Sequence, residues 1–118
     1  MMTKTTKILA ILFITGLFFT TVTAWAEQLR KVEANQVCMV NNVYMEKPQI
    51  PVKVGKQTYY GCCDMCAGIL NKDRSARFST DPVSGKEVDK AKAIIGAKPN
   101  NEVLYFENEK NFKAFTSQ

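Results

Sequence analysis

Residues Tyr59-Tyr60-Gly61-Cys62-Cys63-Asp64-Met65-Cys66 form the stretch around which this chain of 118 residues is organised. Three of the four cysteines fall within it, and the fourth is Cys38, which is followed directly by Met39. The chain contains no histidine. Any metal or catalytic site must therefore be built from sulfur, carboxylate and backbone groups, and we interpret the rest of the chain as the scaffold of this cluster.

The residues around the cluster predict a hairpin followed by a helix. Residues 52–59 are rich in strand-forming residues, and Gly55 can adopt the positive φ that a two-residue turn needs. The second strand is expected at residues 58–60, immediately before the cysteines. A helix is expected from residue 63 or 64 to about residue 71, because Asp64 suits a first helical turn and the following apolar residues recur at helical spacing.

Shorter signals predict the remaining elements. The polar start, residues 27–36, is expected to be loosely docked, and the β-branched residues of 37–44 favour a strand or knuckle around Cys38. The other predicted elements are a strand at 77–80, a turn at 81–85, a helix at 90–95 capped by Asp89 and stopped by Gly96, a loop at 98–101, a strand at 103–106, and a helix capped by Asn108 and ending near 115.

The two halves of the chain repeat each other weakly. Residues 60–66 align with residues 105–111, and Val37-Cys38 aligns with Val83-Ser84. In the second copy, polar residues occupy the positions of the cysteines, namely Ser84, Glu107 and Asn111. We therefore predict a small single α+β domain of two tandem ββα(β), treble-clef-like units, about 37–80 and 81–118, of which the first carries the thiol site. Chance similarity of short matches is the alternative.

The first 26 residues have the pattern of a signal peptide. Lys4 and Lys7 form a short basic region, residues 8–19 are mostly apolar, and Ala24-Trp25-Ala26 fits a cleavage site. The mature domain is then 27–118, in the periplasm or secreted. An uncleaved anchor is the alternative, but the apolar run is short for a span of about 20 residues. We expect no stable membrane span after cleavage, and no lipid anchor, because no cysteine lies near the cleavage site.

The net charge of the mature chain is modest. The whole chain has 16 basic and 11 acidic residues and a net charge of +5, which loss of Lys4 and Lys7 lowers to about +3. These charges are spread evenly along the sequence. The pattern therefore argues against a nucleic-acid partner and favours an ordinary solvated surface.

The cysteine spacing indicates a site for a soft metal ion. Cys62 and Cys66 both fall at the expected N-terminal end of a helix, where the helix dipole favours thiolates, and Cys38 would join them from the distant knuckle. Thiolate and thioether ligands suit Cu(I) above all, whereas Zn(II) usually takes four ligands in a tetrahedron. Zinc would need Cys63, Asp64 or water as the fourth ligand. Cys63 is expected to point away from Cys62.

Two methionines are further candidate ligands. Met39 directly follows Cys38, and Met65 directly precedes Cys66. Thioether sulfur adds readily to a thiolate site for Cu(I). Packing on the inner face of the helix is the alternative role for Met65, because methionine commonly fills gaps in a core. Met39 is therefore the stronger candidate of the two.

The thiol pattern, Cys38 with Cys62-x3-Cys66 after an aromatic pair, resembles that of the TRASH and YHS metal-binding modules. The stretch from Asp81 to Gly96 is similar to the corresponding stretch of the NosL family, periplasmic Cu(I)-binding proteins that assist the maturation of copper enzymes and have two related ββαβ halves. The resemblance covers most of residues 37–116. It implies Cys38, Cys62 and Cys66 as ligands, with Met39 as a further one; the usual Cys-Gly-Met of the family is Cys38-Met39 here.

The leading hypothesis is an exported, non-catalytic protein that carries or scavenges Cu(I), with Zn(II) or another soft metal such as mercury as the alternative ion. A copper exporter or a copper enzyme would be its partner. The first competing function is a thiol–disulfide oxidoreductase that uses Cys63-Asp64-Met65-Cys66, a CxxC at a helix start. The second is a disulfide-stabilised binding module without metal, since four cysteines in a small exported chain can form two bridges.

Overall fold

A computed structural model of the chain describes residue 16 and residues 28–118. Apart from Gly16, the proposed signal peptide and the mature start at Glu27 lie outside the described residues. The described part is α+β. Among the described residues, no helix has the length and apolar character needed to span a bilayer.

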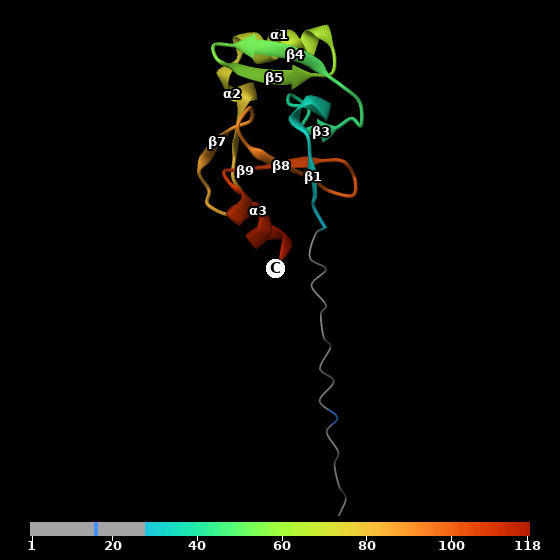
Figure 1. The fold of residues 1–118 in the computed structure, drawn as a ribbon, viewed down its shortest axis with the longest axis vertical. Helices are drawn as coiled ribbons and strands as arrows, with labels where there is room; N and C mark the ends of the chain where they lie inside the picture. The colour runs from blue at the N-terminus through green and yellow to red at the C-terminus, as the bar shows by residue number, and fades with distance from the viewer. Residues whose placement is uncertain (1–15, 17–27) are drawn as a thin grey trace, which may run out of the picture.

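The elements follow one another in the order shown in Figure 1. The strands are β1 Arg30–Val32, β2 Val37–Cys38, β3 Val43–Tyr44, β4 Ile50–Val54, β5 Gln57–Gly61, β6 Phe78–Thr80, β7 Glu87–Asp89, β8 Ile94–Ala97 and β9 Val103–Phe106. The helices are α1 Asp64–Lys72, α2 Arg74–Arg77 and α3 Glu109–Thr116, and a short 3-10 helix, Ala34–Gln36, precedes β2.

The strands form one three-stranded sheet, in the order β1-β8-β9, and three two-stranded hairpins, β2-β3, β4-β5 and β6-β7, all antiparallel. Helix α1 packs on the β4-β5 hairpin at one end of the molecule, and α3 packs against β8 and β9 at the other (Figure 1). The cysteines lie where β2, β5 and α1 meet.

The predicted hairpin and the helix after it are confirmed. Val54 pairs with Gln57, so Gly55 and Lys56 form a two-residue turn, and Gly55 has the positive φ of 61° that such a turn requires. Strand β5 then places Tyr59 and Gly61 in the interior. Helix α1 follows within three residues of β5, as the sequence predicts.

One hydrophobic core joins the two halves of the chain. Its buried residues come from both, namely Val37, Met39, Tyr59 and Leu70 from the first and Ile95, Ala97, Val103 and Tyr105 from the second. A shared core of this kind makes residues 28–118 a single domain, because neither half buries its apolar residues alone.

The predicted helix at 90–95 is wrong. Residues 90–92 form a turn, and β8 begins at Ile94 as the central strand of the three-stranded sheet. Asp89 does not cap a helix: its carboxylate accepts hydrogen bonds from the backbone N–H of Ala91 and from the hydroxyl of Tyr59, both at 2.9 Å. Pairing with β1 and β9 on both sides outweighs the weak helical preference of the local sequence.

The loosely docked start expected for residues 27–36 is also wrong where it is described. Strand β1 pairs with β8 over three residues, from Arg30 opposite Ala97 to Val32 opposite Ile95. The start of the domain is therefore an edge strand of the sheet.

Gly96, expected to end a helix, instead lies in β8 beneath two apolar side chains. A methyl group added there would lie 2.9 Å from Cε2 of Phe112 and 3.1 Å from Cδ1 of Leu29. We expect Gly96→Ala to lower the free energy of unfolding by about 1–3 kcal/mol through overpacking. Gly68→Ala is the matched control: nothing lies within 4 Å of its added methyl group, and it should stabilise α1 by about 0.5–1 kcal/mol. Urea unfolding curves compare the two, and equal effects would contradict the close packing at Gly96.

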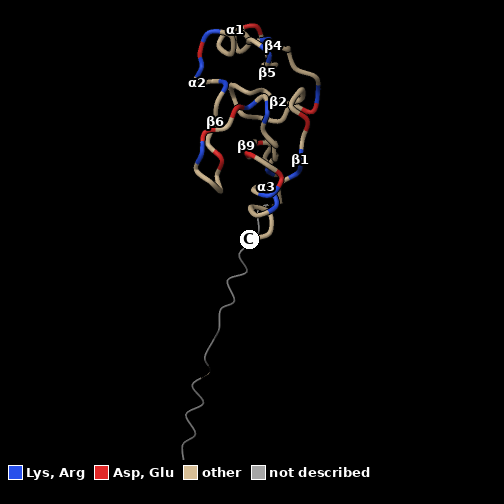
Figure 2. The backbone as a smooth tube through the Cα atoms, turned by 60° about the vertical axis from the view of Figure 1, so that its left-hand side comes forward, with Lys and Arg blue, Asp and Glu red and all other residues tan. Residues whose placement is uncertain are grey.

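Charged residues of both signs are distributed along the backbone of residues 28–118 (Figure 2). Pairs of opposite charge link Lys31 with Glu109 and Arg74 with Glu87. Both pairs are exposed, so solvent screening leaves each with little effect on stability. The surface charges therefore do little to position the site.

Candidate metal centre

Three sulfur atoms converge from separate elements. Cys38 ends β2, Cys62 follows β5, and Cys66 lies in the first turn of α1. Their Sγ atoms all lie within 4.8 Å of one another, and the Sγ atoms of Cys62 and Cys66 are 3.7 Å apart. Among the described cysteines and acidic residues, these three form the group whose ligand atoms are close enough to hold a metal ion.

Backbone contacts hold the three elements together at this point. The N–H of Met39 donates to the carbonyl of Tyr60 at 2.9 Å, which ties the end of β2 to the end of β5. Gly61 then allows α1 to approach the strand closely, since a Cβ atom at Gly61 would lie 3.1 Å from both the Ala67 nitrogen and the Cys66 Cβ. The cysteine positions are thus fixed by β-strand ends and a helix start, which are rigid elements.

Cys63 has a different role from the other three cysteines. It is the N-cap of α1, with extended backbone (φ −154°, ψ 171°), and its Sγ accepts a hydrogen bond from the N–H of Cys66 at 3.5 Å. Serine, threonine, aspartate and asparagine usually fill this position, so the thiol takes the place of an oxygen acceptor. Its sulfur is outside the group of three. The expectation that it points away from Cys62 is nevertheless wrong, because hydrogen bonds link its thiol to those of Cys62 and Cys66.

The site is buried on one side and open on the other. Cys38 is fully buried and Cys66 is 6% exposed, whereas Cys62 and Cys63 are exposed. All four thiols are free, and the amide of Asn41 donates to the Sγ of Cys62 at 3.7 Å. An ion held by the three sulfurs would therefore be reachable from the surface through Cys62.

The thiols of the group differ in acidity. Burial opposes ionisation of Cys38, but hydrogen bonds from the Asn41 backbone and from Cys62 outweigh it and lower the pKa of Cys38. Burial raises the pKa of Cys66 to about 12, and the hydrogen bond to Cys38 followed by burial raises the pKa of Cys62. Cys38 is therefore the most acidic of the three thiols, and binding of a metal ion would release the protons that the thiols carry.

The two methionines differ in burial. Met39 is fully buried and belongs to the hydrophobic core, while Met65 is 76% exposed. Packing of Met65 on the inner face of α1 is therefore wrong. Met39 and Met65 as further ligands stay predictions.

Searches of protein-family models, of curated proteins and of solved structures found no match to this chain. The resemblance to the TRASH and NosL proteins therefore stays a prediction. The proposed function rests on the geometry of the three-sulfur group.

A buried lysine beside the site was not predicted from the sequence. Lys90 is 4% exposed, and its Nζ donates to the carbonyl of Met39 at 2.6 Å and to Oδ1 of Asn42 at 3.0 Å. Burial lowers the pKa of Lys90 to about 8, and the charge of Cys38 opposes that shift. No signal in the sequence indicates its burial, because lysine is almost always at the surface.

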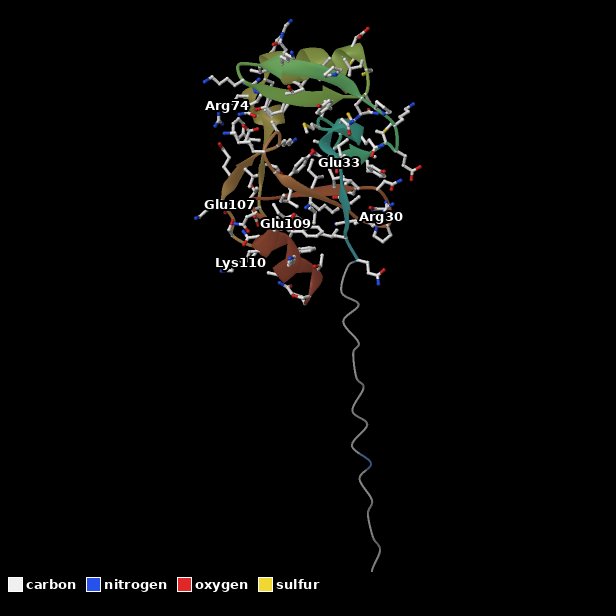
Figure 3. All side chains as sticks on the ribbon, in the orientation of Figure 1. Arg30, Glu33, Arg74, Glu107, Glu109 and Lys110 are labelled. Carbon is white, nitrogen blue, oxygen red and sulfur yellow. The ribbon has the colours of Figure 1, made fainter. Side chains whose placement is uncertain are left out.

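The second half places its polar counterparts around a buried carboxylate. Asp81 is fully buried, and its carboxylate accepts hydrogen bonds from the N–H groups of Val83, Ser84 and Glu107 and from the amide of Asn111. Ser84, Glu107 and Asn111, which align with Cys38, Cys62 and Cys66, thus meet at one point. Glu107 lies just before α3, whose first two residues are Glu109 and Lys110 (Figure 3).

The two strand-to-helix junctions are alike in their backbone. Asn108 caps α3 with φ −158° and ψ 171°, close to the values at Cys63, and its side chain accepts from the N–H of Asn111 as Cys63 does from that of Cys66. The sequence prediction of Asn108 as a cap is confirmed. The treble-clef-like nature of the two units stays a prediction.

Proposed function

We propose that this chain binds a soft metal ion, Cu(I), through Cys38, Cys62 and Cys66, as a carrier or scavenger without catalytic activity. The observation that supports the proposal most is the approach of three free thiols to within 4.8 Å of one another. A protein stabilised by disulfides would pair its cysteines instead. Three sulfur atoms around one point are a ligand set that fits Cu(I).

The choice of Cu(I) over Zn(II) rests on the number and kind of ligands. A structural zinc site takes four protein ligands. Cys63 and Asp64 are the nearest fourth candidates in sequence, but the close group among the described residues consists of the three cysteines. Hg(II) shares the preference for thiolates, so a mercury-handling protein is the closest variant of the proposal.

The signal-peptide pattern and the free thiols support a proposal for the compartment and the partner. A signal peptide would take the chain to the periplasm or outside the cell, where unprotected thiols are oxidised. Metal occupancy would protect them. We therefore propose a copper exporter or a copper enzyme as the partner that loads or unloads the site, with the exposed Cys62 as the side from which it approaches.

Titration of the reduced mature protein with Cu(I) against a competing chelator tests the proposal. We expect one equivalent to bind tightly, with loss of three free thiols to alkylating reagents, and elemental analysis of protein purified from the periplasm should find copper. The double variant Cys62→Ser, Cys66→Ser should lose this affinity. Unchanged binding by the double variant would defeat the proposal, and four thiols blocked in the native protein without metal uptake would favour the disulfide-stabilised module.

A thiol–disulfide oxidoreductase is the second candidate function. In its favour, Cys63 is exposed, and hydrogen bonds from the backbone and thiol of Cys66 lower the pKa of Cys63. Against it, the sulfur 3.7 Å from that of Cys66 belongs to Cys62, outside the CxxC. Insulin reduction separates the two functions: a carrier should show no turnover, whereas an oxidoreductase should lose its turnover in Cys63→Ser.

A further inference from the structure

The buried ammonium group of Lys90 has no carboxylate partner in the part of the chain that the structure describes. Its two hydrogen bonds go to neutral oxygens, the carbonyl of Met39 and Oδ1 of Asn42, and its Nζ lies 5.1 Å from the centre of the Tyr105 ring. A buried charge is costly unless an opposite charge or an equivalent set of dipoles compensates it. A nearby anion would therefore stabilise the charged form of Lys90.

The three-sulfur group becomes such an anion when its thiols lose their protons to hold a metal ion. Nζ of Lys90 donates to the carbonyl of Met39, the residue next to Cys38. The loop from Met39 to Asn42 thus lies between a buried cation and the sulfur group. Lys90 belongs to the turn before β8, in the second half of the chain, and so brings a cation next to the thiol site of the first half.

We propose that Lys90 is a positioning residue of the metal centre, which supplies a fixed positive charge against the anionic metal–thiolate complex and holds the loop that carries Cys38. This inference rests on the proposed function. Three thiolates around Cu(I) leave two net negative charges, and the same ligands around Zn(II) leave one. A buried cation behind the ligands offsets part of that charge, and its effect on binding is larger for Cu(I) than for Zn(II).

Asn42→Asp tests the charge without removing Lys90. Asn42 has a positive φ of 56°, which aspartate tolerates, and its Oδ1 already accepts from Lys90 and from the hydroxyl of Tyr105. A carboxylate there keeps both hydrogen bonds and neutralises the ammonium group. We expect Cu(I) affinity to fall about tenfold and Zn(II) affinity by a smaller factor, while the melting temperature of the metal-free protein does not fall.

Asn101→Asp is the matched control. Asn101 also has a positive φ, 70°, and its Oδ1 also accepts from a cation, Nη2 of Arg30 at 3.0 Å. It makes no hydrogen bond to the three cysteines within the described residues. The same change of charge at this position should leave affinity for both ions within about twofold of the wild type, because Asn101 is partly exposed to solvent and its side chain pairs with Arg30 rather than with Lys90.

Two variants of Lys90 complete the experiment. Lys90→Met removes the charge and should lower Cu(I) affinity at least as far as Asn42→Asp, and Lys90→Arg should recover most of it. The inference is overturned if Asn42→Asp binds Cu(I) as the wild type does, or if all variants weaken Cu(I) and Zn(II) by equal factors, as a purely structural role predicts. Should the wild type itself fail to bind Cu(I), the proposed function falls first, and this inference falls with it.

Discussion

Replacing Cys66 by serine is expected to weaken Cu(I) binding at least about a hundredfold, whereas replacing Cys63 by serine should leave it within about threefold. Loss of a ligand costs more than the 10–100-fold typical of a residue that only supports a ligand. The two cysteines lie three residues apart at the start of α1, but only Cys66 belongs to the three-sulfur group. The pair of variants therefore separates a ligand from its neighbour.

We also expect Cys63→Ser to stabilise the metal-free protein. Serine is a preferred N-cap, and its oxygen would accept from the N–H of Cys66 more strongly than the thiol does at 3.5 Å. Chelator competition gives the affinities, and thermal melting of both metal-free proteins shows whether either change disturbs the fold. Equal losses of affinity in the two variants would mean that Cys63 is a ligand and that the site differs from the one proposed.

Asp81→Ala is expected to lower the free energy of unfolding by about 3 kcal/mol, the largest effect on stability outside the apolar core. The change leaves several polar donors without their acceptor, and each such group costs about 1–3 kcal/mol where it is buried. Two of the lost hydrogen bonds, from the N–H of Glu107 and the amide of Asn111, hold the start of α3 against the turn after β6. Urea denaturation measures the loss.

The same carboxylate makes stability depend on pH. Burial opposes ionisation, but hydrogen bonds from Glu107, Asn111, Val83 and Ser84 outweigh it and lower the pKa of Asp81 below its ordinary 3.8. A carboxyl with a lowered folded-state pKa stabilises the protein fully above its unfolded pKa and loses that contribution as the pH falls through the folded value. The wild type should therefore lose stability below about pH 4, and Asp81→Asn should lose less. Parallel curves for the two proteins would contradict this role.

Features set by neighbouring residues could be predicted from the sequence. Gly55 fixes the turn of the β4-β5 hairpin, and Asn108 fixes the start of α3, because both depend on the backbone of a few adjacent residues. The convergence of Cys38, Cys62 and Cys66 could be predicted as well. Strand ends and a helix start leave little freedom in the position of a side chain. The spacing of the thiols therefore predicts which sulfur atoms come together.

Features set by tertiary contacts could not be predicted. The sequence from Lys90 to Ile95 suits a helix, yet partners on both sides of β8 make it a turn and a strand. Lys90 is buried for the same reason, since the turn before β8 directs its side chain to Met39 and Asn42. The exposure of Met65 has the same origin: the inner face of α1 is already filled by Cys66 and Leu70.

The cross-links between the halves mean that the thiol site cannot be transplanted as a short motif. In the knuckle that carries Cys38, the N–H of Tyr44 donates to the carbonyl of Asn101, and the carbonyl of Asn42 accepts from the N–H of Val103. Lys90 adds a hydrogen bond to the carbonyl of Met39. An excised peptide of residues 37–80 would keep every cysteine and lose all of these supports. Sulfur ligands in such a peptide would be free to bind several ions in several arrangements, so any preference for a single ion would belong to the whole domain rather than to its cysteines.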